Sequence, residues 1–378
     1  MPALLPHPDA DGLLEYSVVY TDRSLNHMSN RFGIVMRDIS RILKAVYNAS
    51  SVAIVPGSGT FGMEAVARKF ANNERCLILR NGWFSFRWSQ ILDMGHITNN
   101  TTVLNARRAS PGLKEPFAPA RLEEVISAVK ALRPRIVFAP HVETSSGIIL
   151  PDEYVRAVGA AVREVGGLFV LDCIASGTMW VDMVADNVDV LISAPQKGWS
   201  ASPCCGLVVL GERARVRMEQ TKSTSFACDL SKWQQIMESY ERGGFAYHAT
   251  LPTDSLATLR DVMLETERFG FAKAKAEATL LGQEVRALLL HEGFSSVAAE
   301  GFAAPGVIVS YTTNPEIQSA RAFAKAGIQI APGVPLQCDE GDDFKTFRIG
   351  LFGLDKLADR GRTVSTLATA IGAVNRQQ

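Results

Sequence analysis

Apolar runs alternate with amphipathic stretches between residue 50 and about residue 210. The runs are short and continuous, and they cover residues 52–55, 76–80, 135–140, 167–172, 188–194 and 206–210. Two stretches between them, 120–132 and 152–165, have the apolar spacing of helices that pack on a sheet. Continuous apolar strands separated by helices indicate a mostly parallel sheet that is covered on both faces.

The pattern changes after about residue 255. A long helical stretch is predicted through residue 291, followed by a strand at 306–311, a helix at 315–326, strands at 327–331 and 346–350, and a helix from residue 354. This order is typical of a separate α+β domain. We therefore predict an N-terminal segment at 1–22, a large α/β domain at 23–255 and a small C-terminal α+β domain at 256–378.

The overall composition is that of an ordinary globular protein. Lys plus Arg and Asp plus Glu both number 39, so the formal net charge is zero. The lack of a basic excess argues against binding to nucleic acid or to an anionic membrane surface. No run reaches the roughly 18 apolar residues that span a bilayer, and the start of the sequence lacks the pattern of a secretory signal. We therefore expect a cytoplasmic protein.

The cysteines give no sign of a metal centre. All six, at positions 76, 173, 204, 205, 228 and 338, lack the C-x-x-C spacing, and they do not combine with the six histidines in a metal-ligand pattern. We expect free, buried thiols and no bound metal.

A glycine turn lies between the apolar run 52–55 and a helical stretch at 63–70. Its glycines have the spacing G-x-G-x-x-G, and they and the hydroxyl residues among them are Gly57, Ser58, Gly59, Thr60 and Gly62. The first backbone N–H groups of a helix have no partner within the helix, and the helix dipole favours an anion there. The turn therefore predicts a phosphate site.

The glycine spacing alone does not say whose phosphate is bound. A dinucleotide site would also need an acidic residue about 20 positions further on, at the end of the next strand. That strand, 76–82, carries Arg80 and Asn81 near its end. An arginine is compatible with a 2′-phosphorylated nucleotide, so these residues leave the question open.

Two further strand ends carry reactive side chains. The run 167–172 ends in Asp172, and Gln196 and Lys197 follow the run 188–194. Because ligands of parallel sheets bind outside the carboxyl ends of the strands, these side chains are expected to face the glycine turn. An amine, a carboxylate and an anion site together suit pyridoxal phosphate rather than a nicotinamide. Taken alone, a lysine just after a strand is usually solvated, and an aspartate at the end of a strand often caps a helix.

At this point the sequence resembles a known family, the class V aminotransferases of fold type I, and in particular the alanine–glyoxylate and serine–pyruvate aminotransferase group. The motifs that carry the resemblance occur in order between about residues 30 and 365, and they read "GSGTFGMEA", "NGWFS", "HVETSSGIILP", "LDCIAS", "SAPQKGWSASPCCG", "YHATLP" and "FRIGLFG". The resemblance implies pyridoxal 5′-phosphate as the cofactor. It also implies an α/β fold with a mostly parallel seven-stranded sheet and a smaller C-terminal α+β domain.

The resemblance gives the cofactor-binding residues. It implies that Lys197 forms a Schiff base with the cofactor and moves the substrate's α-proton, and that Asp172 keeps the pyridine nitrogen protonated. The phosphate-binding positions are Ser58, Gly59, Thr60 and Gln196. Thr144 matches the residue that hydrogen-bonds the phenolic oxygen. Phe84 matches the ring-stacking position, and a shift of one residue would replace it by Trp83.

Other motif residues match positions that bind substrate or a second subunit. Arg348 resembles the arginine that binds the substrate carboxylate, because a guanidinium fork matches a carboxylate through two parallel N–H bonds. Tyr247 and Thr250 match positions that reach into the neighbouring subunit's site. The resemblance therefore implies a homodimer with shared active sites.

The implied activity is a transaminase reaction of the EC 2.6.1 type. An amino group would move from a small L-amino acid of the alanine or serine type to a 2-oxo acid of the glyoxylate or pyruvate type. One segment departs from the family, because residues 15–31 contain no glycine or proline where relatives often have a Gly-Pro segment over the substrate. Asn26, His27 and Arg31 are candidates to line that side of the pocket.

Two alternatives stay open on the sequence. A pyridoxal-phosphate lyase or cysteine desulfurase would use a mobile cysteine, and Cys338 lies ten residues before Arg348. A binding protein without activity is also compatible with the fold, although the presence together of Lys197, Asp172 and Arg348 argues against it.

Overall fold

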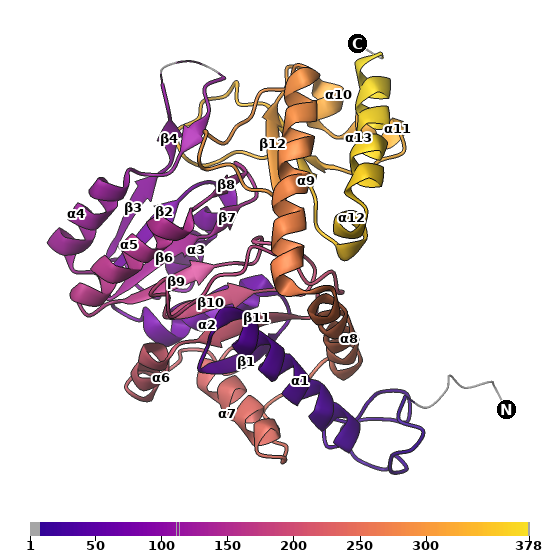
Figure 1. The fold of residues 1–378 in the computed structure, drawn as a ribbon. Helices are drawn as coiled ribbons and strands as arrows, with labels where there is room; N and C mark the ends of the chain where they lie inside the picture. Colours follow the sequence, from indigo (N-terminus) through magenta and orange to yellow (C-terminus); the bar gives the residue numbers. More distant parts are fainter. Residues whose placement is uncertain (1–7, 111, 113, 377–378) are drawn as a thin grey trace.

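A seven-stranded mixed sheet lies at the centre of the larger part of the molecule (Figure 1). The computed structural model describes residues 8–110, 112 and 114–376, so the first seven residues of the predicted segment 1–22 and the last two of the predicted small domain lie outside the described residues. The strand order is β1-β11-β10-β9-β6-β2-β3. The strands are β1 (Ser51–Pro56), β2 (Cys76–Arg80), β3 (Thr101–Asn105), β6 (Ile136–Pro140), β9 (Leu168–Asp172), β10 (Val190–Ser193) and β11 (Cys205–Leu210).

All of these strands run parallel except β11, which is antiparallel to β1 and to β10. The central strands β6, β9, β10 and β11 are buried along their whole length, which explains their continuous apolar sequences. The prediction of a mostly parallel sheet is confirmed.

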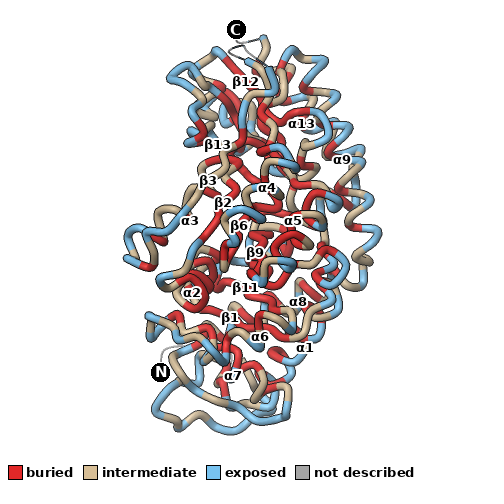
Figure 2. Tube along the Cα trace, turned by 90° about the vertical axis from the view of Figure 1, so that its left-hand side faces the viewer, coloured by how far each residue is buried: buried red, intermediate tan, exposed pale blue. Residues whose placement is uncertain are grey.

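Helices cover both faces of this sheet. They are α1 (Asn30–Tyr47), α2 (Gly59–Phe70), α3 (Trp83–Met94), α4 (Leu122–Leu132), α5 (Asp152–Glu164), α6 (Glu212–Glu219), α7 (Leu230–Glu241) and α8 (Thr253–Phe269). Figure 2 shows α2 and α3 on one side of the buried strands and α4, α5 and α8 on the other. The sheet is therefore buried between two helical layers.

The C-terminal part has its own small antiparallel sheet, with strand order β12-β14-β13. Its elements are α9 (Phe271–His291), β12 (Val307–Tyr311), α10 (Pro315–Gln318), α11 (Arg321–Lys325), β13 (Ala331–Pro332), β14 (Thr346–Gly350), α12 (Leu354–Ala358) and α13 (Arg360–Asn375). A separate hydrophobic cluster joins α9 and α13 to this sheet. Two short hairpins complete the fold: β4 (Arg107–Arg108) with β5 (Phe117–Ala118), and β7 (Val142–Glu143) with β8 (Ile148–Ile149).

Several predicted elements differ in detail. The helical stretch through residue 291 is broken at Gly270, whose φ of 96° lies outside the helical region. The predicted helix 315–326 is interrupted at Ala320, which adopts a left-handed φ of 65°. The predicted strand 327–331 pairs only from Ala331 onward.

The six cysteines are free and buried, as expected from their spacing. In the part of the chain that the structure describes, no helix combines the length and apolar character needed to cross a membrane.

Candidate active site

The glycine turn brings the N-terminus of α2 against the carboxyl ends of the sheet strands. Gly57 has a φ of 120°, and its N–H donates to the carbonyl oxygen of Cys204 at 2.9 Å. A Cβ at Gly59 would lie 2.6 Å from Cδ1 of Ile174, and a Cβ on Gly206 of β11 would lie 2.8 Å from Cα of Gly62. Glycine is therefore required both for the turn and for the close approach of α2 to the sheet.

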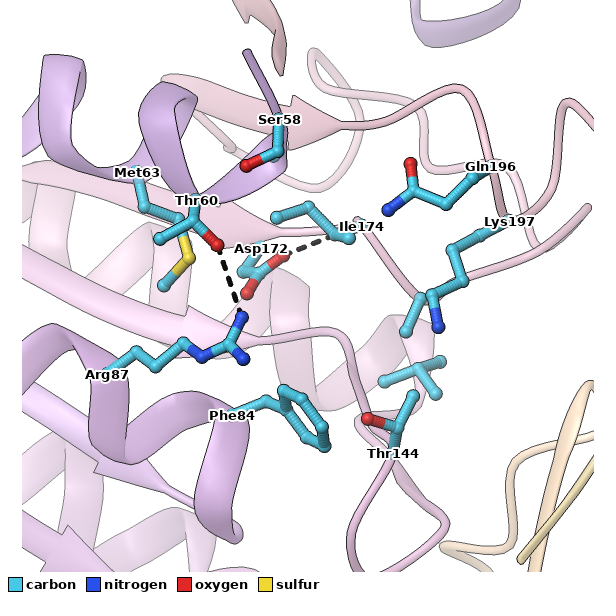
Figure 3. Close-up of a pocket in the computed structure, with 13 residues that line it drawn as sticks. Ser58, Thr60, Met63, Phe84, Arg87, Thr144, Asp172, Ile174, Gln196 and Lys197 are labelled. Carbon is cyan, nitrogen blue, oxygen red and sulfur yellow. Dashed lines mark hydrogen bonds between the residues drawn. The ribbon is translucent and has the colours of Figure 1, made fainter. Parts of the chain in front are cut away.

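A cavity of about 240 Å³ opens beside this helix terminus. Among the residues that line it are these predicted site residues: Ser58, Gly59, Thr60, Phe84, Thr144, Asp172, Gln196 and Lys197. Figure 3 shows Lys197 and Thr144 on one side of the cavity and Arg87 on the other. The structure thus brings together residues from five separate segments of the chain.

Asp172 ends β9 and is only 7% exposed. Burial raises the pKa of its carboxyl to about 7. The N–H of Ile174 donates to Oδ1 at 2.9 Å, and this hydrogen bond opposes the shift. The charge of Glu143 adds to the shift, and the charge of Arg87 opposes it. A buried carboxylate with one hydrogen bond is well suited to pair with a cationic ring nitrogen.

Lys197 lies in the loop after β10 and is partly buried. Burial lowers the pKa of its amine, and the positive charges of Arg348 and Arg87 lower it further. A larger share of the amine is therefore neutral, which is the form that attacks a carbonyl or accepts a proton.

The walls of the cavity include two apolar side chains, Phe84 at the start of α3 and Ile174 after β9. Trp83, the alternative stacking residue, packs near the ring of Phe86 with the centroids 6.0 Å apart and does not belong to the lining found among the described residues. This placement favours Phe84 as the ring that would stack on a flat ligand.

Glu143 was not singled out from the sequence, yet it fixes the start of α3. Its side chain is fully buried and accepts hydrogen bonds from the backbone N–H groups and hydroxyls of Ser85 and Ser145, and from the N–H of Phe84. One carboxylate therefore holds both the Phe84 backbone and the loop that carries Thr144.

Arg87 also escaped the sequence analysis. Its Nη1 donates to Oγ1 of Thr60 at 3.2 Å, and its guanidinium carbon lies 4.8 Å from the centroid of the Phe84 ring. Arg87 is three positions after Phe84, which places both on one face of α3. That helical spacing was the signal that could have found it.

Arg348, on β14, approaches the cavity from the small sheet. Its Nε donates to the carbonyl oxygen of Pro332 at 2.8 Å, its Nη1 lies 3.5 Å from the carbonyl oxygen of Thr144, and its guanidinium carbon lies 5.6 Å from the centroid of the Phe84 ring. Burial lowers the pKa of its guanidinium, and the Glu143 charge opposes this. The guanidinium is thus close to the cavity and hydrogen-bonded to neutral carbonyl groups.

Other predicted residues lie away from this cavity within the same chain. Tyr247 and Thr250 are exposed and hydrogen-bond each other through their hydroxyls at 3.2 Å. Asn26 donates to Glu15 and Ser17 of the N-terminal segment. None of the three lines the cavity that the described residues of this chain form.

The two other N-terminal candidates also have contacts elsewhere. His27 is buried beside the rings of Tyr20 and Tyr247, and Arg31 donates to the carbonyl oxygen of Pro8.

Cys338 does not have the environment of a mobile nucleophile. Its side chain is only 5% exposed, and burial raises the pKa of its thiol to about 12. Its Sγ lies 3.4 Å from the carbonyl oxygen of Arg80. A thiol held protonated against the sheet argues against the desulfurase alternative.

Comparisons with known proteins find several relatives that are named as aminotransferases, and two that are named as soluble hydrogenase subunits. No protein-family model matches the chain. It is 26% identical over 336 residues to the 2-aminoethylphosphonate–pyruvate transaminase of Syntrophobacter fumaroxidans, an alignment that covers 85% of this chain and 84% of the relative. It is also 26% identical over 227 residues to the L-aspartate–glyoxylate aminotransferase of Paracoccus denitrificans, covering 59% of this chain and 55% of the relative.

A solved structure agrees over nearly the whole chain. The alanine–glyoxylate aminotransferase from Nostoc sp. superposes with a TM-score of 0.78 at 24% identity, covering 93% of this chain and 89% of that chain. The chain has the fold of the class V aminotransferases. The resemblance predicted from the motifs is confirmed, and with it fold type I.

Proposed function

We propose that the chain is a pyridoxal-phosphate-dependent aminotransferase. It would move an amino group from a small L-amino acid of the alanine or serine type to a 2-oxo acid of the glyoxylate or pyruvate type. The observation that carries the proposal is the convergence of Lys197, Asp172 and the N-terminus of α2 on one cavity. The comparisons support the reaction class, since several relatives are named as transaminases or aminotransferases.

The residues around the cavity fit pyridoxal phosphate. The amine of Lys197 suits its aldehyde, the carboxylate of Asp172 suits its ring nitrogen, and the cavity walls at Phe84 and Ile174 are apolar as a flat ring requires. When bound, this group withdraws electrons from the α-carbon of an attached amino acid.

The phosphate end of the cavity has the required donors. The N-terminus of α2 and the hydroxyls of Ser58 and Thr60 lie there, and within the described residues the Ser58 side chain makes no capping bond to the helix. An anion at this place meets both hydrogen-bond donors and the positive end of the helix dipole.

Lys197 and Asp172 have complementary tasks in this proposal. The Asp172 carboxylate would accept a hydrogen bond from the N–H of the pyridine ring and so would hold that nitrogen protonated. The Lys197 amine would hold the cofactor, and as a free amine it would take and return the proton at the substrate's α-carbon. The lowered pKa of the Lys197 amine, which burial and the nearby arginines cause, favours its role as a base.

Arg348 would bind the substrate carboxylate. Its present hydrogen bonds go to carbonyl oxygens, so an incoming carboxylate can take guanidinium N–H groups without breaking an ion pair found among the described residues. Two parallel N–H bonds would fix both the charge and the orientation of the amino acid.

The active unit in this proposal is a homodimer whose sites are each built from both chains. Large apolar side chains are exposed around the "YHATLP" motif, namely Phe226 at 77%, Phe245 at 53% and Tyr247 at 56%. Such exposure is typical of an interface between subunits. A two-fold interface is self-complementary, so both sites would be shared in the same way.

Two measurements test the activity. Borohydride reduction of the enzyme followed by peptide mass analysis should find the pyridoxyl group on Lys197, and attachment to another lysine would refute the assignment. Keto-acid formation from alanine, serine, aspartate and 2-aminoethylphosphonate, each with glyoxylate or pyruvate, should then identify the substrates. Absence of amino transfer from every donor would refute the reaction class.

The shared site is tested by mixing two inactive variants. Lys197→Ala and a bulky Thr250→Trp are unfolded and refolded together in equal amounts. If Thr250 serves the partner's site, a mixed dimer has one site with both lesions and one site with neither, so about a quarter of wild-type sites should return. If Thr250 serves its own chain, no activity returns.

A further inference from the structure

A phenylalanine from the small sheet lies against the Lys197 amine. Phe352 is the second residue after β14 and lies four positions after Arg348. Nζ of Lys197 lies over the Phe352 ring, 5.5 Å from its centroid. At this distance the negative face of an aromatic ring attracts a cation.

The position of the ring is defined by close packing. A Cβ at Gly177, Gly306 or Gly350 would lie 3.4 to 3.5 Å from an atom of the Phe352 ring, so three backbone segments approach the ring closely. The backbone that carries the lysine is anchored at the same place, since a Cβ at Gly198 would lie 2.1 Å from the carbonyl oxygen of Gly177. The Phe352 ring and the backbone next to Lys197 thus both pack against the loop at Gly177.

The other groups around the amine act against its protonated form. The charged side chains that face it are Arg348 from β14 and Arg87 from α3, and Asp172 from β9 lines the same cavity. Burial and the two arginines disfavour the ammonium. The ring of Phe352 favours the ammonium without being titratable itself.

We propose that Phe352 is a positioning residue that holds the Lys197 amine in its protonated form, as the amine must be after it takes the substrate's α-proton. The proposal rests on the proposed function for the source of that proton, whereas the contact between ring and amine is given by the structure itself. Arg348 lies on β14 and Phe352 lies just after its end. The residue that would bind the substrate carboxylate and the residue that would hold the Lys197 amine therefore come from the same strand and the turn that follows it.

The first test measures the Lys197 amine directly in cofactor-free protein. Trace acetylation of Lys197 is followed against pH by peptide mass analysis in the wild type, F352L, F352M, F352Y and the control F302L, which removes another partly buried phenylalanine. The titration midpoint should fall by about half a pH unit in F352L and F352M, a threefold change in protonation. F352Y and F302L should keep the wild-type midpoint.

Several outcomes would overturn the proposal. One is a titration midpoint that stays at the wild-type value in both F352L and F352M. Another is a shift in F302L as large as the shift in F352L. The third is a midpoint in F352Y that falls as far as the midpoint in F352L. Thermal unfolding of each variant identifies any that fail to fold, and two non-aromatic replacements keep the test decisive if one of them does.

The second test uses the holoenzyme. F352L should lower kcat about threefold and leave KM for the amino acid unchanged, because carboxylate binding at Arg348 does not involve the ring. A rise in KM with unchanged kcat would indicate a role in binding instead and would overturn the proposal. Failure of the proposed function is recognised separately, as absence of the pyridoxyl group from Lys197, and it leaves the acetylation result standing.

Discussion

Asp172→Asn should stabilise the cofactor-free protein at neutral and alkaline pH while it impairs the loaded enzyme. Asp172 is only 7% exposed, and its carboxylate accepts one backbone N–H, from Ile174. Asparagine has nearly the same shape and keeps an oxygen acceptor for that bond. The substitution therefore removes the charge and leaves the packing intact.

The magnitude follows from the change in pKa. Burial raises the pKa of Asp172 from 3.8 to about 7, and a difference of about 3 units corresponds to about 4 kcal/mol. Because the native state keeps its proton to a higher pH than the unfolded chain, the stability from this group is full below about pH 4 and is lost as the pH rises through about 7. Asparagine has no proton to lose. The variant should match the wild type near pH 4 and exceed it by up to about 4 kcal/mol at pH 8.

Urea unfolding of cofactor-free wild type and variant at pH 5 and pH 8 provides the assay. The difference in free energy of unfolding should grow by about 2.5 kcal/mol between these pH values. The exposed Asp93→Asn serves as the matched control and should show no such growth. In the cofactor-loaded enzyme, turnover should instead favour the wild type. D172N cannot hold the ring nitrogen protonated, so it should lose most of its turnover. A pH-independent difference, or a variant less stable at pH 8, would refute the reasoning.

Three further substitutions test the site. Glu143→Gln places an NH₂ group against N–H and O–H donors, so it should destabilise the fold by about 2 to 4 kcal/mol in thermal or urea unfolding, whereas the exposed Glu164→Gln should have little effect. Arg348→Lys should raise KM for the amino acid strongly because a point charge cannot form the bidentate fork, and an unchanged KM would assign carboxylate binding to another residue. Gly59→Ala should weaken cofactor binding through the 2.6 Å clash with Cδ1 of Ile174, and the double variant with Ile174→Ala should recover part of the affinity in a cofactor titration.

The apolar pattern predicted six strands of the large sheet and missed the strand at one of its two edges. Six strands appear as continuous apolar runs because both faces of each are covered by helices. The strand Thr101–Asn105 contains polar residues and is exposed or partly exposed along its length at one edge of the sheet, whereas β1 at the other edge is buried and apolar. The seventh strand was therefore expected only from the resemblance to known aminotransferases.

The candidate site was predictable where topology alone brings residues together. Asp172 and Lys197 follow parallel strands, whose carboxyl ends lie on one side of any such sheet. The role of Glu143 was not predictable, because it depends on contact with Phe84 and Ser85, 59 and 58 residues away in sequence. A side chain that accepts hydrogen bonds from the first N–H groups of a distant helix leaves no periodic pattern in the sequence.

The arrangement divides the site between the two sheets. The large sheet supplies the amine, the acid and the anion-binding helix terminus, all of which would contact the cofactor, whereas β14 and its exit supply Arg348 and Phe352, which would contact the substrate carboxylate and the proton carrier. The two halves approach each other where Nη1 of Arg348 lies 3.5 Å from the carbonyl oxygen of Thr144. A carboxylate is a stronger acceptor for a guanidinium than a neutral carbonyl. The substrate carboxylate would therefore replace the weak contact of Arg348 with the Thr144 carbonyl by a stronger hydrogen bond. An amino acid without a properly placed carboxylate would not make this bond to Arg348.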